Sequence, residues 1–210
     1  TTESKIRYDL FDVPQAVAAH DPDAVAPLAP TVRREFTDIT ATGTTKAAAI
    51  ELLATIADTH PDVISSLDPF VKYDEEAAGV VAAVGGPEHT ETLLGAGKFT
   101  SDLIATLADG LDDEGRTAVR EAVVAATEDD DPEIRVRALA TVSEVFHGEL
   151  DDPAAIYLAR LDDTEGDGYD TVRETAAQGL RTVAAEDPDR LSGAVDRLFE
   201  AAKAAHDADD

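Results

Sequence analysis

Apolar residues recur along this chain at the three- and four-residue intervals expected of helices that bury one face. Ile50, Leu53 and Ile56 form one such stripe, and a second runs from Ile64 to Val71. Alanine occupies many of the remaining positions, which favours helix and lets neighbouring helices approach closely. No alternation of apolar and polar residues, the pattern typical of strands, extends beyond a few positions. The pattern therefore predicts a chain built of helices.

The same periodicity, read with the proline and glycine positions, sets the expected helix boundaries. We expect helices over 13–20, 22–37, 44–58, 61–73, 75–84, 88–95, 100–110, 114–128, 132–147, 153–162, 170–185 and 188–206. Glycine is frequent in the stretch 79–100, where each glycine costs a helix about 1 kcal/mol relative to alanine. We expect one domain over 1–210, with an irregular repeat or hinge at 79–100.

Internal repeats are visible in the helix starts. Pro-Asp pairs begin predicted helices at Pro22, Pro61 and Pro188, and the first two lie 39 residues apart. A shift of 38 residues aligns the apolar positions and the arginine of segment 134–145 with those of 172–183. Proline is well placed at the start of a helix, because its missing N–H would have no helical partner there. A sequence unit of two helices that recurs along the chain predicts a repeat array.

The clearest copies are Pro132-Glu-Ile-Arg-Val-Arg-Ala-Leu and Asp170-Thr-Val-Arg-Glu-Thr-Ala-Ala, with a weaker copy at 44–50. These blocks resemble the second helix of HEAT repeats. The resemblance covers 113–206 best and implies an all-α, right-handed α-solenoid of about five antiparallel helix pairs with a concave binding face. It also implies that Arg135 and Arg173 bond acidic residues of neighbouring repeats.

Charge sets the expected environment and excludes some partners. The formal net charge is −28, with 28 Asp and 17 Glu against 17 Lys and Arg. Such an aspartate-rich composition is typical of cytoplasmic proteins of salt-accumulating microbes such as halophilic archaea, because high salt screens the self-repulsion. Nucleic acid is an unsuitable partner for this charge. No apolar run is long enough to span a membrane, and we expect a cytoplasmic monomer.

Candidate chemistry is sparse. The chain has no cysteine. Its histidines, at positions 20, 60, 89, 147 and 206, include no pair at the i, i+4 spacing of helical zinc sites. Segment 95–100, Gly-Ala-Gly-Lys-Phe-Thr, departs from a phosphate-binding loop, since phenylalanine follows the lysine and no apolar strand precedes it. We therefore assign no catalytic, cofactor-binding or metal-binding residue, and no cofactor.

The segment 163–174 carries the best chemical motif. It has acids at its positions 1, 3, 5 and 12 and glycine at position 6, a spacing that resembles the calcium loop of EF-hand proteins. Its third position is glutamate and its eighth is Asp170, where that loop has Asp or Asn and an apolar residue. The alternative is a solvated connection in which Asp170 caps the next helix.

These observations favour a non-catalytic scaffold or adaptor that binds another protein or a peptide on the concave face of a HEAT-like solenoid. The alternatives are an enzyme or cofactor-loading lyase or chaperone of the same class, and a cation-sensing adaptor acting through 163–174. We expect most phenylalanines to lie in the core, and any that is exposed on the concave side would be the first candidate contact. They are Phe11, Phe36, Phe70, Phe99, Phe146 and Phe199.

Overall fold

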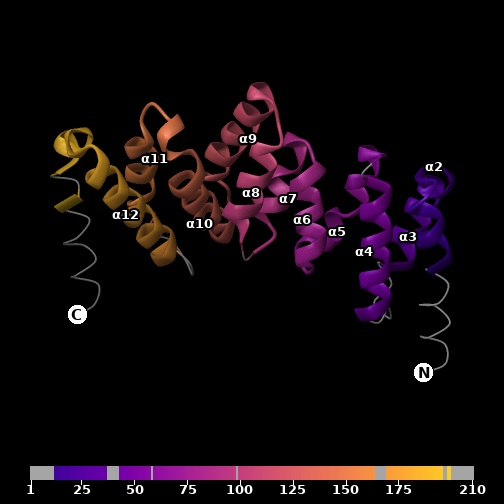
Figure 1. Ribbon diagram of the computed structural model, residues 1–210. Helices are drawn as coiled ribbons and strands as arrows, with labels where there is room; N and C mark the ends of the chain where they lie inside the picture. The colour runs from indigo at the N-terminus through magenta and orange to yellow at the C-terminus, as the bar shows by residue number, and fades with distance from the viewer. Residues whose placement is uncertain are drawn as a thin grey trace. The chain divides into compact units, whose positions relative to one another are not determined.

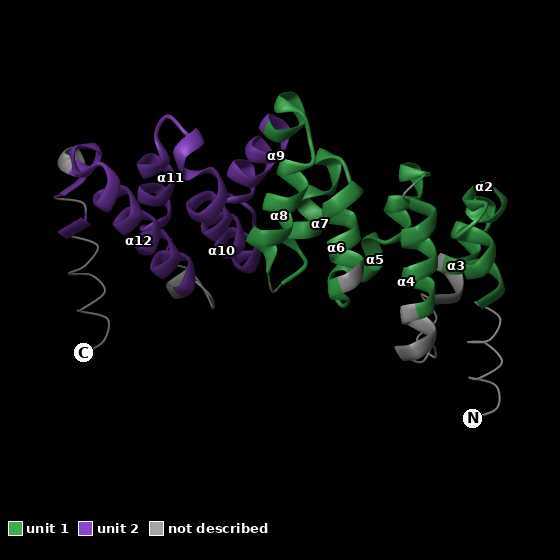
Figure 2. Ribbon diagram, viewed as in Figure 1, with its two compact units in different colours: residues 1–116 green, residues 117–210 purple. Residues whose placement is uncertain are grey.

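The computed structural model describes residues 12–36, 43–57, 59–97, 99–163, 169–195 and 198–199. Every regular element in these ranges is helical, which confirms the all-α prediction. The chain divides into two compact units, residues 1–116 and 117–210 (Figure 2). The irregular stretch 79–100 therefore lies inside the first unit.

The first unit contains short helices joined by tight turns (Figure 1). In chain order they are α2 (Pro22–Val25), η1 (Ala26–Leu28), α3 (Ala29–Phe36), α4 (Gly43–Ala57), η2 (Pro61–Ser66), α5 (Asp68–Val71), α6 (Glu75–Val84), η3 (Pro87–His89), α7 (Thr90–Leu94) and α8 (Thr100–Asp109). Helix α4 packs against α3, η2 and α6, and α6 packs in turn against α5 and α8. Apolar side chains of α4 and α6 form the core of this unit.

The next helix, α9 (Asp113–Ala126), crosses the boundary between the units. The elements that follow are α10 (Pro132–Thr141), the π-helical turn η4 (Val142–Phe146), η5 (His147–Glu149), α11 (Pro153–Arg160), α12 (Tyr169–Glu186) and η6 (Pro188–Ala194). Helix α12 packs against α10, α11 and η6, so it is central to the second unit.

Two predicted helices are interrupted by proline. The predicted helix 22–37 divides into α2, η1 and α3, and the predicted helix 61–73 divides into η2 and α5. Pro27 lies in the first turn of η1 and Pro69 in the first turn of α5. Proline has no N–H to donate to the preceding turn, and its ring collides with the carbonyl four residues earlier. The apolar residues keep their helical spacing across both prolines, so the sequence pattern predicted one continuous helix at each site. The structure has separate helical segments there.

Two long-range polar contacts join residues that begin or precede helical elements. His60 Nε2 lies 2.7 Å from Asp23 Oδ1, which joins the residue before the second Pro-Asp start to the aspartate of the first. In the second unit, Arg190 Nη1 donates to the backbone oxygen of Asp151 over 3.3 Å. These partners are separated by 37 and 39 residues in the sequence. Each unit therefore contains at least one contact between residues separated by nearly the length of the predicted repeat.

Arg135 forms a buried ion pair with an acidic residue that follows α11. Its side chain is buried, and its Nε lies 3.4 Å from Asp163 Oδ2 just after α11. Its Nη1 also donates to the backbone oxygens of Asp129 and Asp130, at 2.5 and 3.2 Å. One guanidinium thus holds the start of α10, the turn before it and the end of α11 together.

The closest helix contact in the second unit is between α11 and α12. Gly179 of α12 faces the ring of Tyr157 of α11, and a β-carbon added at Gly179 would lie 2.5 Å from the ring atoms Cδ1 and Cζ. Tyr157 is fully buried. Burial raises the pKa of its phenol to about 12, although the neighbouring Ser143 side chain opposes part of that rise. Glycine is required here because it lets the helix backbone approach the ring.

Candidate functional site

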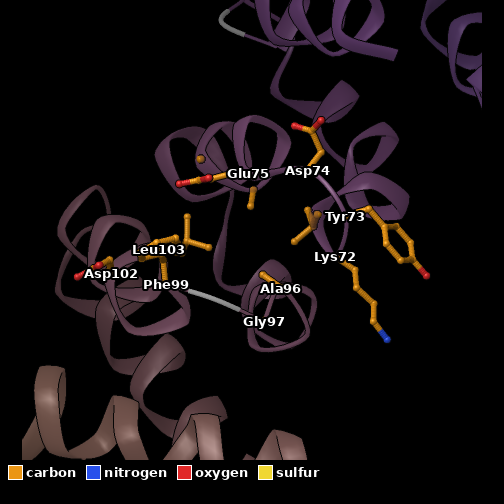
Figure 3. Close-up of a pocket in the computed structure, with 12 residues that line it drawn as sticks. Lys72, Tyr73, Asp74, Glu75, Ala96, Gly97, Phe99, Asp102 and Leu103 are labelled. Carbon is orange, nitrogen blue, oxygen red and sulfur yellow. The ribbon is translucent and has the colours of Figure 1, made fainter. Parts of the chain in front are cut away.

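The most distinctive surface feature of the first unit is an open groove of about 660 Å³ between α5, α6 and α8 (Figure 3). Its lining comes from the turn after α5, the first half of α6, the turn before α8 and the first turn of α8. These residues are Val71, Lys72, Tyr73, Asp74, Glu75, Ala78, Gly79, Ala96, Gly97, Phe99, Asp102 and Leu103. Gly79, Ala96, Gly97 and Phe99 belong to the stretch 79–100 that the sequence marked as irregular, and the other lining residues flank it.

Small and aliphatic residues line much of the groove. Ala78 and Gly79 on α6 contribute almost no side-chain volume, and Leu103 and Val71 add aliphatic surface. A β-carbon placed on Gly79 would have no heavy atom within 4 Å. The small size of Ala78 and Gly79 leaves space on this side of α6. An apolar side chain of a ligand would bury its surface on this floor.

Phe99 stands at the edge of the groove in an unusual backbone conformation. Its φ of 64° and ψ of 19° place it in the left-handed region, which costs an L-residue roughly 1–2 kcal/mol. Its ring is nevertheless 58% exposed, so little burial offsets that cost. Strained residues are concentrated at functional sites, and this one carries an exposed aromatic ring.

Local hydrogen bonds fix the two ends of this strained turn. Gly97 has a φ of 87°, and its backbone oxygen accepts a 2.8 Å hydrogen bond from the hydroxyl of buried Thr100. Leu103 N donates to Phe99 O over 3.0 Å and starts helix α8. These hydrogen bonds join Gly97 to Thr100 and Phe99 to the first turn of α8.

The rim of the groove is acidic. Among the described lining residues, Asp74, Glu75 and Asp102 contribute carboxylates, and Lys72 contributes an ammonium. Asp74 Oδ1 accepts a 3.1 Å hydrogen bond from Ala77 N and so caps α6. Lys72 and Tyr73 extend outward from the turn after α5 (Figure 3), and Tyr73 is 83% exposed.

The phenylalanine prediction is confirmed in part. Phe70 and Phe146 are buried as expected, whereas Phe99 and Phe199 are exposed. The side chains of Phe11 and Phe36 lie outside the described residues. The prediction was wrong for Phe99 because the apolar pattern takes no account of the turn that precedes α8.

Three described histidines, His60, His89 and His147, contact carboxylates. His89 is buried, with Nδ1 3.1 Å from Asp68 Oδ1 and Nε2 3.6 Å from Glu88 Oε1. Because both ring nitrogens face carboxylates, neither is directed at a substrate position. His147 Nε2 lies 3.2 Å from Glu186 Oε2 and connects η5 to the end of α12.

The two motifs considered for ligand binding gain no support. Segment 95–100 follows helix α7, not the strand that a phosphate-binding loop requires. In the segment 163–174, Asp163 is engaged by Arg135 and lies 3.8 Å from Arg160 Nη1, and residues 164–168 lie outside the described part. Among the described residues, no group of three or more possible ligands is placed to hold a metal ion.

Comparisons with known proteins add no assignment. No known protein family, characterised protein or solved structure matches this chain. The described helices include none long and apolar enough to cross a membrane. Function must therefore be argued from the groove itself.

Sequence reasoning missed the groove, although two signals pointed near it. The glycines of 79–100 marked an irregular stretch, and an aromatic residue between Gly97 and Thr100 is unusual in a turn. Neither signal gives the backbone angle at Phe99 or the open space above Gly79, because both depend on how α6 and α8 pack.

Proposed function

We propose that this chain is a non-catalytic, salt-adapted adaptor of the HEAT-like α-solenoid class, and that the groove beside Phe99 binds an extended segment of a partner protein. The observation that carries the proposal is the exposed ring of Phe99, held in a strained conformation over an apolar groove. Contacts between residues 37 and 39 positions apart support the repeat class.

The composition of the groove favours binding over catalysis. Its residues offer carboxylates, one ammonium and two aromatic rings, an inventory without a nucleophile beside a matched base. A volume near 660 Å³ accommodates one or two apolar side chains with the backbone that carries them, within the range of roughly 300–1,000 Å³ usual for ligand pockets. Solenoids present such extended surfaces to peptides.

A substitution that fills the groove tests the proposal. We expect Gly79→Leu to remain folded, since its β-carbon meets no neighbour within 4 Å, and to occupy the floor. Random twelve-residue peptides would be selected by mRNA display on the full chain in about 2 M KCl, where acidic repulsion is screened. Affinities of the enriched peptides would be measured by fluorescence anisotropy. We expect Gly79→Leu to weaken their binding by at least about ten-fold, or 1.4 kcal/mol.

Gly148→Leu is the matched control, because a β-carbon at Gly148 also has no neighbour within 4 Å and this glycine lies outside the groove. Phe99→Gly is the second test variant. It removes the ring and the strain together, so its melting temperature should hold or rise while affinity falls. The proposal fails if selection enriches no peptide, or if the enriched peptides bind Gly79→Leu and Phe99→Gly as tightly as the original chain.

Salt dependence tests the proposed adaptation. We expect the melting temperature of the full chain to rise between about 0.1 and about 2 M KCl, because the Debye length falls from ~10 Å at 0.1 M to ~3 Å at 1 M. The largest gain should occur below about 1 M, where repulsion within a charge of −28 is lost fastest. Sulfate stabilises proteins by exclusion from their surface, so a weakly excluded salt at equal ionic strength is the control. A flat melting temperature would refute salt adaptation.

A further inference from the structure

We infer that the groove recognises a cationic segment in which arginine flanks one apolar side chain, with Glu75 and Asp102 as the recognition carboxylates. This inference rests on the proposed peptide-binding function and names the chemistry of the partner. Three features of the rim support this inference: its charge, the lack of ion pairs at two of its carboxylates among the described residues, and the position of the exposed Phe99 ring.

The described lining of the groove carries more negative than positive charge. Three carboxylates and one ammonium line the groove, and Asp74 already caps α6 through its 3.1 Å bond from Ala77 N. Glu75 and Asp102 are exposed, and neither pairs with a cationic side chain in the part of the chain that the structure describes. Two carboxylates from different helices are therefore available to a ligand.

The neighbourhood of Phe99 selects arginine over lysine. Phe99 and Asp102 lie three residues apart at the start of α8, on the same side of the groove (Figure 3). A guanidinium stacks on an aromatic ring while it donates a paired set of hydrogen bonds to a carboxylate, whereas an ammonium is a compact, strongly hydrated point charge. Stacking and paired hydrogen bonds act at contact distance, so salt that screens long-range attraction leaves most of this preference intact.

The apolar floor fixes where the anchor residue lies. Ala78 and Gly79 lie on α6 together with Glu75, and Leu103 lies on α8 together with Asp102, so each carboxylate stands on a helix that also supplies part of the floor. An aliphatic or aromatic side chain on that floor would place the flanking residues of an extended segment beside the two carboxylates. The expected ligand therefore has leucine or a similar residue with arginine next to it on both sides.

Synthetic twelve-residue peptides test this directly. One carries a central leucine flanked by arginines, the second has lysines in their place, and the third has citrulline, which keeps the shape of arginine without its charge. Binding to the full chain would be measured by fluorescence anisotropy in about 0.5 and about 2 M KCl. We expect the arginine peptide to bind at least about ten-fold more tightly than the citrulline peptide and several-fold more tightly than the lysine peptide.

Charge-neutral variants assign the preference to specific residues. The double variant Glu75→Gln, Asp102→Asn should reduce the arginine-over-citrulline preference to less than about two-fold and leave citrulline-peptide affinity unchanged. Glu51→Gln, Asp62→Asn is the matched control, since both of its side chains are exposed in the same unit and outside the groove. This control should retain the full preference.

The outcomes separate the two proposals. If peptides bind and Gly79→Leu abolishes that binding, but arginine and citrulline bind alike, the groove is a peptide site and the inference about arginine is wrong. If the control pair lowers the preference as much as Glu75→Gln, Asp102→Asn, overall charge causes it and the inference is also wrong. If Gly79→Leu binds all three peptides as tightly as the original chain, the proposed function fails as well.

Discussion

Leu180→Asp is expected to unfold the second unit at temperatures where the original chain is stable. Leu180 is 3% exposed and lies on α12, which packs against α10, α11 and η6. An aspartate there must either hold an unpaired charge out of water or take up a proton, and either costs several kcal/mol. Since domains are stable by only about 5–15 kcal/mol, the change removes most of the available stability. Thermal unfolding followed by circular dichroism, with hydrogen exchange of the α12 amides, measures it.

Ala177→Asp is the control, because it adds the same charge to the same helix at an exposed position. Its cost should stay near the helix-propensity difference, below about 1 kcal/mol. If Leu180→Asp melts within about 2 °C of Ala177→Asp, position 180 does not lie in the core and the repeat register deduced from segments 134–145 and 172–183 is wrong.

Replacing glycine by alanine is expected to change the stability of the chain in opposite directions at two helical positions, 179 and 79. Gly179→Ala should destabilise the chain, because its new β-carbon would lie 2.5 Å from atoms of the buried Tyr157 ring. Overpacking of this kind costs roughly 1–3 kcal/mol. Gly79→Ala, also inside a helix, should stabilise by up to about 1 kcal/mol, because the helix gains alanine's propensity and no atom lies within 4 Å of its β-carbon.

Denaturant unfolding of the two variants gives both free energies. A second change identifies the clash: in a Tyr157→Leu background, Gly179→Ala should cost measurably less, since the ring it collides with is gone. Equal stabilisation by both alanines would mean that α12 does not approach the Tyr157 ring as the structure places it.

Features set by local chemistry were predictable from the sequence. The proline positions and the apolar period located many of the helices, and the arginine of the clearest block, Arg135, was expected to bond an acidic residue, although the sequence did not indicate Asp163 as its partner. Each of these depends on residues whose role is the same wherever they occur: proline at a first turn, or an arginine that stays charged when buried.

Features set by packing were not predictable. Gly79 and Gly179 are both glycines within helices, yet one faces open space and the other a tyrosine ring. Phe99 has the same apolar character as Phe70 and Phe146, but the turn before α8 exposes it. Such differences depend on which helix packs opposite a residue. The spacing of apolar residues predicts which face of a helix is buried, but it does not predict which helix packs against that face.

The contacts between residues one period apart also determine how the chain would respond to tension. In each unit the main packing joins elements that are close in the sequence, and ties such as His60 to Asp23 and Arg190 to Asp151 close loops of 37 and 39 residues. A pulling force on the ends would load these loops in series. The hydrogen bonds between paired strands of a sheet, in contrast, can share a force in parallel. Each rupture would release a loop of on the order of 130 Å of extended chain. Under load the protein would lengthen in steps, with the elements beyond each break still folded.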